Sequence, residues 1–247
     1  MDILKVNKLK DIVDKSKYIV FLGGAGTSTE SDIPDFRSTE GLYSKKSNYN
    51  VPPEEILSIG FFNSQTDAFY KYYRDNLIHP DAMPNLAHKA LYELEKRASL
   101  KAVVTQNIDG LHQMAGSKNV IEIHGSLYKN YCQECGKKFN VNFILDNDGV
   151  PLCDECGGKI RPDVVMYGEP LDQILLEKSI NHVSKADLLI VGGTSLKVYP
   201  AAGLIRYFNG QNLVIINKTE TKYDSLATMV FKESIGRILE KVVMKDE

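Results

Sequence analysis

The chain has 247 residues, of which 43% are hydrophobic and 25% are charged, proportions that are ordinary for a globular protein. Its formal net charge of −2 does not indicate a nucleic-acid-binding surface. The longest apolar runs, such as residues 18–22, are far too short to cross a bilayer. The N-terminal residues also lack the continuous apolar stretch of a signal peptide. We therefore expect a cytoplasmic monomer with no nucleic-acid partner and no membrane partner.

Short apolar runs alternate with helical patterns along most of the chain. It opens with apolar residues at helical spacing, from Ile3 to Val13. Continuous apolar runs, typical of strands buried on both faces, follow at residues 18–22, 102–105, 120–123, 188–191 and 213–216. Further helical patterns begin after Asn85 and Ser234, both suitable N-cap residues. This alternation predicts an α/β fold, a Rossmann-like parallel sheet with helices on both faces.

Two stretches interrupt the alternation and predict a second, smaller domain. Residues 39–83 are rich in Tyr, Phe, Asn and Pro, with a helix expected near residues 65–77, and residues 127–162 carry all four cysteines. We therefore expect a nucleotide-binding domain built from residues 1–38, 84–126 and 163–247. The small domain would combine a helical insertion with a cysteine-rich module.

The cysteines form two C-x-x-C pairs that are separated by 17 residues, a spacing typical of zinc ribbons. The ligands would be Cys132, Cys135, Cys153 and Cys156. Four thiolates complete a tetrahedron and leave no open position, so the zinc would be structural. The alternatives are a redox dithiol pair and a ribbon that grips nucleic acid. Residues 131–160 mix Lys with Asp and Glu, which disfavours the nucleic-acid interpretation.

A small-residue loop, Gly24-Ala25-Gly26, directly follows the first predicted strand. Such a loop, opening toward a helix, lets backbone N–H groups approach a pyrophosphate. Thr29 replaces the third glycine of the dinucleotide fingerprint, so the match is imperfect and does not indicate hydride transfer. Phe36 and Arg37 follow shortly after; they could cover a bound ring and pair with phosphate, or belong to an ordinary surface loop.

Seven motifs together resemble those of the sirtuin family in order and spacing. They are residues 24–38, 105–112 (TQNIDGLH), 122–125 (EIHG), the two cysteine pairs taken as one, 164–169 (VVMYGE), 193–196 (GTSL) and 216–217. The resemblance covers about residues 4–243 and is closest to bacterial deacetylases. It implies an NAD-dependent protein-lysine deacetylase that consumes NAD, transfers the acyl group to ADP-ribose, and releases nicotinamide and 2′-O-acetyl-ADP-ribose.

The same resemblance assigns the catalytic roles. His124 would be the general base that, through the ribose hydroxyls, activates the 2′-hydroxyl to attack the alkylimidate intermediate, a role that suits an imidazole. Asn107 and Asp109 would line the nicotinamide pocket, with Ile108 as an apolar wall. Gln106 would contact the ribose, and Phe36 would shield the developing cation from water.

The remaining assignments concern NAD binding and the peptide. The phosphate side would be formed by Ala25, Thr29 and Arg37, and Gly24, Gly26 and Gly193 would also contact NAD. The other phosphate and adenosine contacts would come from Thr194, Ser195, Asn217, Lys218 and Ser234. Main-chain pairing would join the acetyl-lysine protein or peptide to Gly168, Glu169, Lys197 and Val198, while Val165 and Tyr167 would wall the lysine tunnel.

The chain departs from the usual family pattern at three positions. Asp32 stands where glycine is usual, Tyr167 where phenylalanine is frequent, and Lys197 where valine is frequent. Asp32 could stiffen its loop, Tyr167 adds a hydroxyl beside the tunnel, and Lys197 places a charge near the peptide.

The acyl preference is a separate question. Family members that prefer acidic acyl groups carry a Tyr-x-x-Arg pair, but the third position after Tyr70 is Tyr73, and Arg74 comes one residue later. A helix turns about 100° per residue, so Arg74 would point elsewhere. We therefore expect a neutral acyl group, acetyl first.

Three alternative functions remain. They are a deacylase for longer neutral acyl groups, a mono-ADP-ribosyltransferase, and a non-enzymatic zinc-ribbon module that binds nucleic acid.

Overall fold

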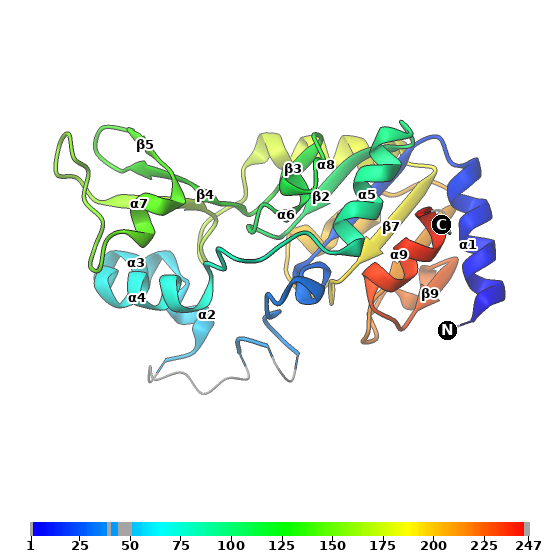
Figure 1. The fold of residues 1–247 in the computed structure, drawn as a ribbon, viewed down its shortest axis with the longest axis horizontal. Coiled ribbons are helices and arrows are strands. Elements are labelled where there is room, and N and C mark those ends of the chain that lie inside the picture. Colours follow the sequence, from blue (N-terminus) through cyan, green and yellow to red (C-terminus); the bar gives the residue numbers. More distant parts are fainter. Residues whose placement is uncertain (1, 39–40, 44–50, 245–247) are drawn as a thin grey trace.

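The computed structural model describes residues 2–38, 41–43 and 51–244. Parts of the predicted insertion, residues 39–40 and 44–50, therefore lie outside the described residues. The described chain forms a larger lobe around a parallel sheet and a smaller lobe beside it (Figure 1). Both ends of the chain lie on the larger lobe, on the side away from the smaller one.

The larger lobe is built on a six-stranded sheet in the order β3-β2-β1-β7-β8-β9, with every neighbouring pair parallel. Its strands are β1 (Ile19–Gly23), β2 (Leu100–Thr105), β3 (Val120–Glu122), β7 (Leu188–Gly192), β8 (Asn212–Ile216) and β9 (Met229–Phe231). The first five confirm the predicted strands. The sixth, β9, has three residues, too few to produce a recognisable pattern. Because the strands are parallel, their carboxyl ends meet at one edge, where α/β sheets bind ligands.

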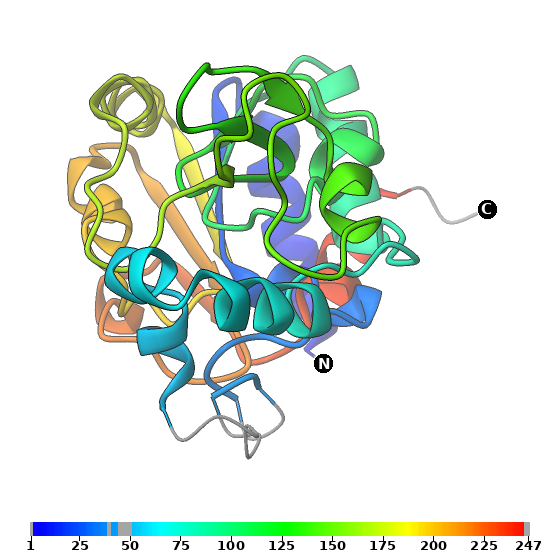
Figure 2. The same cartoon turned by 90° about the vertical axis from the view of Figure 1, so that its left-hand side faces the viewer.

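Helices cover both faces of this sheet, as predicted. One face packs against α1 (Ile3–Lys15), α5 (Leu86–Lys96) and α9 (Ile235–Val243), and the other against α8 (Gln173–Lys185) and the 3₁₀ helix η3 (Ala201–Tyr207). Figure 2 shows α8 (yellow-green) on one side of the strands and α9 (red) on the other. Within β1, Phe21 faces the first layer, whereas Val20 and Leu22 face the second. Alternation across two covered faces explains why the whole strand is apolar.

The two predicted helix starts are capped in different ways. The Asn85 side chain accepts from the N–H of Ala87 at 2.9 Å, as local capping predicts. Ser234 stands at the start of α9, but its side chain makes no cap bond. The Glu30 carboxylate accepts from the Gly236 N–H at 2.8 Å and from the Ser234 hydroxyl at 3.1 Å. A carboxylate at a helix N-terminus is favoured by the helix dipole, and here it comes from a distant part of the chain.

The glycine-rich loop after β1 differs from its prediction. It opens onto two 3₁₀ turns, η1 (Ala25–Thr27) and η2 (Thr29–Ser31), and not onto a regular helix. Asp32 ends the second turn in the left-handed conformation, with φ of 61°. Asp tolerates that region better than most residues, which allows it to occupy a position where glycine is usual.

The smaller lobe combines an antiparallel sheet with helices. The sheet has the order β5-β4-β6, with strands β4 (Gly125–Cys132), β5 (Lys138–Phe139) and β6 (Ile160–Val164). The helices are α2 (Pro53–Ile56), α3 (Ile59–Ser64), α4 (Thr66–Asn76) and α7 (Val141–Leu145), and α4 confirms the helix expected near residues 65–77. Four fully buried rings, from Phe62, Phe69, Tyr70 and Tyr73, form much of the core of this lobe. Strands β4 and β6 run from one lobe into the other.

No described helix has the length and apolar character needed to cross a membrane.

A pair of buried histidines packs beneath the sheet edge. His88 on α5 and His112 on α6 (Leu111–Met114) have ring centroids 4.7 Å apart. The His88 Nδ1 atom accepts from the Asn85 N–H at 3.3 Å. The Nε2 atom of His88 and both ring nitrogens of His112 have no partner among the described residues. Burial lowers the pKa of His88 to about 4 and holds the pKa of His112 well below its usual value. Both rings are therefore neutral in the folded protein.

This pair predicts a loss of stability in mild acid. The unfolded chain accepts protons on these rings that the folded chain refuses, so the free energy of unfolding decreases as pH falls below 6.5. For His88, the change from 6.5 to about 4 corresponds to about 3 kcal/mol. Urea unfolding at several pH values between 7 and 4.5 measures this decrease in the free energy of unfolding. His88→Gln keeps a side chain suited to the third helical position of a capping box and should show a shallower pH dependence. An equal slope in both proteins would contradict the assignment, since acid release of a metal from the cysteines affects both alike.

Candidate functional site

A cavity of about 900 Å³ lies between the two lobes at the carboxyl edge of the large sheet. Its wall is formed by residues from the ends of β1, β2, β7 and β8 together with residues of the small lobe, such as Phe69 on α4. Every residue that the sequence assigned to NAD, to catalysis or to the peptide lines this cavity. The tertiary structure thus gathers side chains that are up to about two hundred positions apart in the sequence.

Three polar side chains at the inner wall form a closed hydrogen-bond network. The Asn107 amide donates to the Ser28 hydroxyl at 2.9 Å and to the Asp109 carboxylate at 3.1 Å. The Ser28 hydroxyl donates to the same carboxylate at 2.6 Å, and the Leu111 N–H donates to its other oxygen at 3.0 Å. Asn107 and Asp109 are therefore held in one orientation. Sequence reasoning did not assign Ser28 to the site. Its place in the glycine-rich loop was the only available signal.

His124 stands at the junction of β3 and β4, where its ring is fixed by the main chain. Its Nδ1 atom is 3.0 Å from the Gln106 carbonyl oxygen. A carbonyl only accepts, so Nδ1 carries the proton and Nε2 is left as the basic atom. Burial lowers the pKa of His124, and the bond to Gln106 opposes this decrease. The ring is therefore neutral at neutral pH. The next residue must be glycine, because Gly125 has φ of 81° and a Cβ there would lie 2.0 Å from the Asp163 carbonyl oxygen.

The loop after β1 needs small residues for a reason other than the predicted approach of its N–H groups to a pyrophosphate. The N–H groups of Gly24 and Gly26 donate to the carbonyls of Gly192 and Gly193, at 3.1 and 2.8 Å, so these two N–H groups do not face a ligand. A Cβ on Gly26 would lie 2.8 Å from the Gly193 Cα atom. The small residues are thus required because the loops after β1 and β7 touch each other. Thr29 is fixed in the same loop by its hydroxyl, which donates to the Gly26 carbonyl at 3.1 Å.

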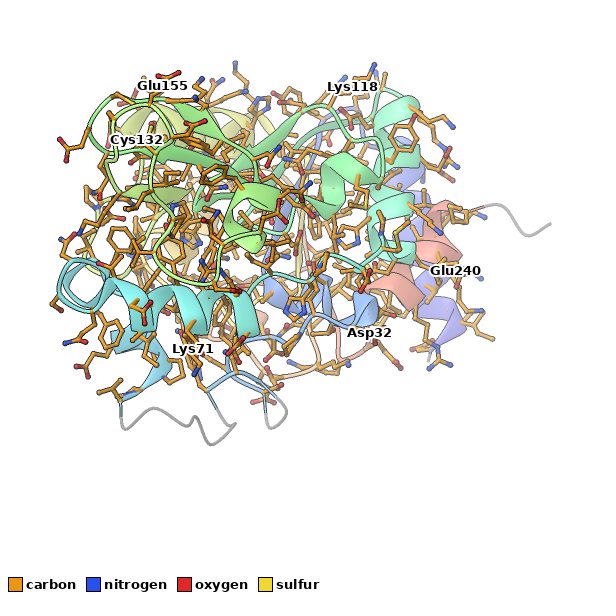
Figure 3. The ribbon with its side chains drawn as sticks, turned by 60° about the vertical axis from the view of Figure 1, so that its left-hand side comes forward. Asp32, Lys71, Lys118, Cys132, Glu155 and Glu240 are labelled. Atoms are coloured by element: carbon orange, nitrogen blue, oxygen red, sulfur yellow. The ribbon has the colours of Figure 1, made fainter. Side chains whose placement is uncertain are left out.

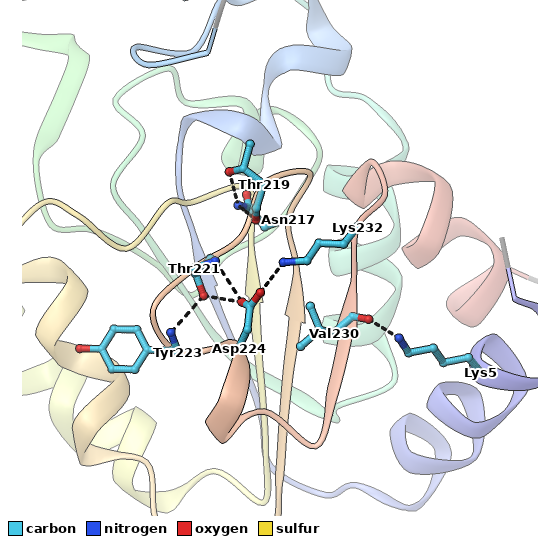
Figure 4. A network of polar contacts seen from close by, with 8 residues as sticks. All are labelled: Lys5, Asn217, Thr219, Thr221, Tyr223, Asp224, Val230 and Lys232. Atoms are coloured by element: carbon cyan, nitrogen blue, oxygen red, sulfur yellow. Dashed lines mark hydrogen bonds and ion pairs between the residues drawn. The ribbon is translucent and has the colours of Figure 1, made fainter.

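The opposite end of the cavity is formed by the segment that follows β8 (Figure 4). The Asn217 amide donates to the carbonyl and the hydroxyl of Thr219, at 2.8 and 3.1 Å. Further along, the Asp224 carboxylate accepts from the Thr221 hydroxyl at 2.6 Å and pairs with Lys232. These contacts fix the loop that carries Lys218. At the centre of the cavity, the Gln106 amide donates to the Thr194 hydroxyl at 3.2 Å, which links β2 to the loop after β7.

The predicted peptide segments have main-chain groups that are partly engaged already. The Glu169 N–H donates to the Met166 carbonyl at 3.0 Å, and its carboxylate forms a bidentate pair with Arg161, at 2.8 and 2.9 Å. The Val198 carbonyl accepts from Ala202. Lys197 is exposed at the cavity rim. The Arg161–Glu169 pair therefore stiffens the turn, and fewer atoms remain for peptide pairing than the sequence suggested.

The four cysteines form one compact cluster at the outer end of the small lobe, where Cys132 and Glu155 lie close together (Figure 3). All four sulfur atoms lie within 4.8 Å of one another, and the Cys132–Cys156 and Cys135–Cys153 sulfur pairs are 3.4 and 3.6 Å apart. A tetrahedron with Zn–S bonds of about 2.3 Å has edges of about 3.8 Å. The cluster therefore fits one zinc ion with four protein ligands, and no ligand position is left for catalysis.

Arg74 points away from the cavity, as its helical position predicted. Its guanidinium donates to the main-chain carbonyls of Ile144 at 2.8 Å and Gly149 at 2.5 Å, which joins α4 to the loop after α7. Tyr73 lines the cavity and is fully buried. It stands at the position where family members that prefer acidic acyl groups carry arginine. Its hydroxyl has no partner among the described residues.

The fold and the site together define a nucleotide-binding α/β protein with a cysteine-cluster lobe. Residues 24–200 match the model of the Sir2 family, and the chain belongs to this family. The NAD-dependent protein deacetylase of Clostridium acetobutylicum is 55% identical over 240 residues, which cover 97% of this chain and 98% of the relative.

Two solved structures extend the comparison. A Sir2 variant with a deacetylated p53 peptide and 3′-O-acetyl-ADP-ribose is 42% identical, with a TM-score of 0.87 over 96% of this chain and 97% of that chain. Sir2 with a p53 peptide and NAD⁺ is also 42% identical, with a TM-score of 0.84 over 96% and 97% of the two chains.

The cysteine cluster predicts that zinc and the small lobe are lost together. Cys132→Ser removes one of four ligands from a site whose binding free energy is folding free energy. We expect the variant to lose most of its zinc and to unfold its small lobe at lower urea concentration. Zinc content by mass spectrometry and near-ultraviolet circular dichroism of the buried tyrosines measure both effects.

Lys137→Ala is the matched control for this change. It removes ion pairs to Asp154 and Glu155 beside the cluster, and ion pairs between exposed side chains add little to stability because water screens them. Zinc content should therefore be unchanged in this variant. A Cys132→Ser protein that keeps a full equivalent of tightly bound zinc would exclude a four-cysteine site.

Proposed function

We propose that the cavity between the lobes is the place where this chain uses NAD to remove acetyl groups from lysine side chains of proteins. The chain is an NAD-dependent protein deacetylase, as its 55% identity to a curated bacterial deacetylase supports. NAD is a consumed co-substrate: its nicotinamide is released, and the acetyl group is transferred to ADP-ribose. The roles of individual residues below are our assignment.

The bond from His124 Nδ1 to the Gln106 carbonyl is the observation on which the mechanism depends. It leaves Nε2 unprotonated at a cavity wall, which is the state a general base requires. We assign to Nε2 the removal of a proton from the ribose hydroxyls, which prepares the 2′-hydroxyl to take up the acyl group. The lowered pKa of His124 keeps this base neutral at cellular pH.

The Ser28–Asn107–Asp109 network is assigned to the nicotinamide end of NAD. The Asn107 amide nitrogen donates to Ser28 and Asp109, and its oxygen is left to accept from a carboxamide N–H. Ile108 adds an apolar wall. Phe36 lies at the wall of the same cavity, and we assign to it the exclusion of water from the cleaved bond.

The remainder of NAD would extend along the carboxyl edge of the sheet. Arg37 supplies a cation for phosphate. The residues assigned to the phosphates and the adenosine are Gly24, Ala25, Gly26, Thr29, Gly193, Thr194, Ser195, Asn217, Lys218 and Ser234, all at the cavity wall. The acetyl-lysine side chain would enter between Val165 and Tyr167, with its peptide beside Gly168, Glu169, Lys197 and Val198.

This assignment also supports a division of the chain and a location. We propose residues 1–38, 84–126 and 163–247 as the NAD-binding domain and residues 39–83 and 127–162 as the small domain. Two of these boundaries fall inside β4 and β6.

All four cysteines are free of disulfides, and thiolates that hold zinc suit a reducing compartment. We therefore propose the cytoplasm.

Replacement of the base tests the mechanism. His124→Ala should lower the deacetylation rate by about 10²- to 10⁴-fold, while NAD binding and zinc content remain close to those of the wild type. Mass spectrometry of the products from NAD and an acetyl-lysine peptide measures the reaction. His182→Ala is the matched control, since His182 lies outside the cavity and its ring contacts Tyr18. A His124→Ala enzyme that keeps more than a tenth of the activity would contradict the assignment.

The pH dependence provides an independent test of the same base. The active form is the neutral imidazole, so the rate should decrease as pH falls through the pKa of His124, which burial places below 6.5. At pH 6.5 the wild type should therefore keep more than half of its rate at pH 8.

Labelled NAD in the same assay tests the mono-ADP-ribosyltransferase alternative, because ADP-ribosyl transfer would leave the label on protein.

The acyl preference follows from the position of Arg74. Its guanidinium is engaged by main-chain carbonyls away from the cavity, so an acidic acyl group would be buried without a cation, which is costly. We expect kcat/KM for an acetyl-lysine peptide to exceed that for the succinyl peptide by at least about tenfold, or about 1.4 kcal/mol. Arg74→Lys should leave this ratio unchanged. A succinyl preference, or a ratio that collapses in Arg74→Lys, would overturn the inference.

A further inference from the structure

Two tyrosine hydroxyls meet at the rim of the cavity. The Oη atoms of Tyr43 and Tyr167 are 2.5 Å apart, although the residues are 124 positions apart in the chain. Tyr167 belongs to the segment that lines the proposed lysine tunnel, and phenylalanine is frequent at that position in the family. Tyr43 belongs to the loop that carries Phe36 and Arg37. The bond therefore joins the peptide side of the cavity to the NAD side.

Tyr167, on the peptide side of this bond, is held by main-chain hydrogen bonds. The Tyr167 N–H donates to the Leu57 carbonyl, and the Tyr167 carbonyl accepts from the Ile59 N–H, both at 3.0 Å. The next residue, Gly168, has φ of 92°, which turns the chain sharply. Tyr167 thus has both main-chain groups engaged by the segment between α2 and α3, and its ring position is defined by the small lobe.

The NAD-side partner supports the two side chains that we assign to NAD. The Tyr43 N–H donates to the Phe36 carbonyl at 2.9 Å, and the Leu42 N–H donates to the Asp35 carbonyl at 2.8 Å. The Tyr43 ring lies 5.5 Å from the Phe36 ring, and the Arg37 guanidinium lies 5.5 Å from the Tyr43 ring centroid. Any movement of Tyr43 therefore changes the surroundings of Phe36 and Arg37. Burial, reinforced by the bond to Tyr167, raises the pKa of Tyr43, so the Tyr43 hydroxyl keeps its proton.

We propose that Tyr167 and Tyr43 are positioning residues: their hydroxyl bond aligns Phe36 and Arg37 for NAD and couples that alignment to the lysine tunnel. The inference rests on the proposed function, which assigns NAD and the acetyl-lysine to the two sides of the cavity. The bond holds Tyr43, and through it Phe36 and Arg37, before NAD arrives, so less conformational entropy is lost when NAD binds. A phenylalanine at position 167 would keep the ring but lose this connection.

Single hydroxyl removals test the proposal. Tyr167→Phe and Tyr43→Phe should each raise the dissociation constant and the KM of NAD by about two- to tenfold, the effect of one neutral hydrogen bond. The kcat at saturating NAD should change less than the KM, because the bond acts on alignment and not on the chemical step. Calorimetry measures NAD binding directly, and steady-state kinetics measures the KM and the kcat.

The double variant separates a shared bond from two unrelated effects. If the hydroxyls act through each other, Tyr43→Phe combined with Tyr167→Phe should weaken NAD binding no more than either single change. Tyr207→Phe is the matched control, since Tyr207 is exposed and lies outside the cavity, and it should bind NAD like the wild type. Additive effects, or unchanged NAD binding in both single variants, would overturn the proposal.

A second measurement tests the coupling to the tunnel. Because an acetyl-lysine peptide would contact Tyr167, the affinity of the wild type for NAD should depend on peptide concentration more strongly than that of Tyr167→Phe. Equal dependence in both would contradict the coupling. Failure of the proposed function itself is distinguishable: it would appear as a wild type that releases no nicotinamide, whereas calorimetry of the variants needs no turnover.

Discussion

The hydrogen bond from His124 to the Gln106 carbonyl joins the two strand ends on which the site depends. Gln106 directly follows β2, and His124 lies two residues beyond the end of β3, the parallel neighbour of β2. Because parallel strands end at the same edge, a side chain from one end can reach the main chain of the other. The bond selects the tautomer of the imidazole and aims its basic nitrogen without help from a second side chain.

The two lobes contribute different properties to this cavity. The parallel sheet provides polar loop ends and hydrogen-bond networks, as in Ser28, Asn107 and Asp109. The small lobe provides apolar surface from its aromatic core and a rigid frame around the cysteine cluster. Structural zinc suits this lobe because a unit of this size has a small core. The cavity between them therefore has a polar wall and a more apolar wall, which suits the polar co-substrate and the aliphatic lysine side chain that we propose for it.

Contacts between distant segments hold the loops around this cavity. The Glu30 carboxylate begins α9, the Gln106 amide reaches the loop after β7, and Tyr43 reaches Tyr167. Each contact joins a loop to a segment that lies far away in the sequence. Loops held in this way can present side chains precisely without belonging to a regular helix or strand. The departure at position 167 adds a hydroxyl at the point where the proposed substrate side and the proposed NAD side meet.

By itself, the sequence determined the elements whose signal is local. The apolar runs predicted five strands of the sheet, Asn85 predicted the start of α5, and the spacing of the cysteines predicted one cluster. Family motifs predicted His124 and the other residues assigned to NAD and the peptide, all of which line the cavity. The tertiary structure alone decided which groups touch: that Ser28 completes the network with Asp109, that Glu30 rather than Ser234 caps α9, and that Gly26 is small because Gly193 lies against it. Periodicity and capping depend on neighbours within a few residues, whereas these contacts join residues separated by 81 to 206 positions. Their partners are brought together only when the whole sheet has formed.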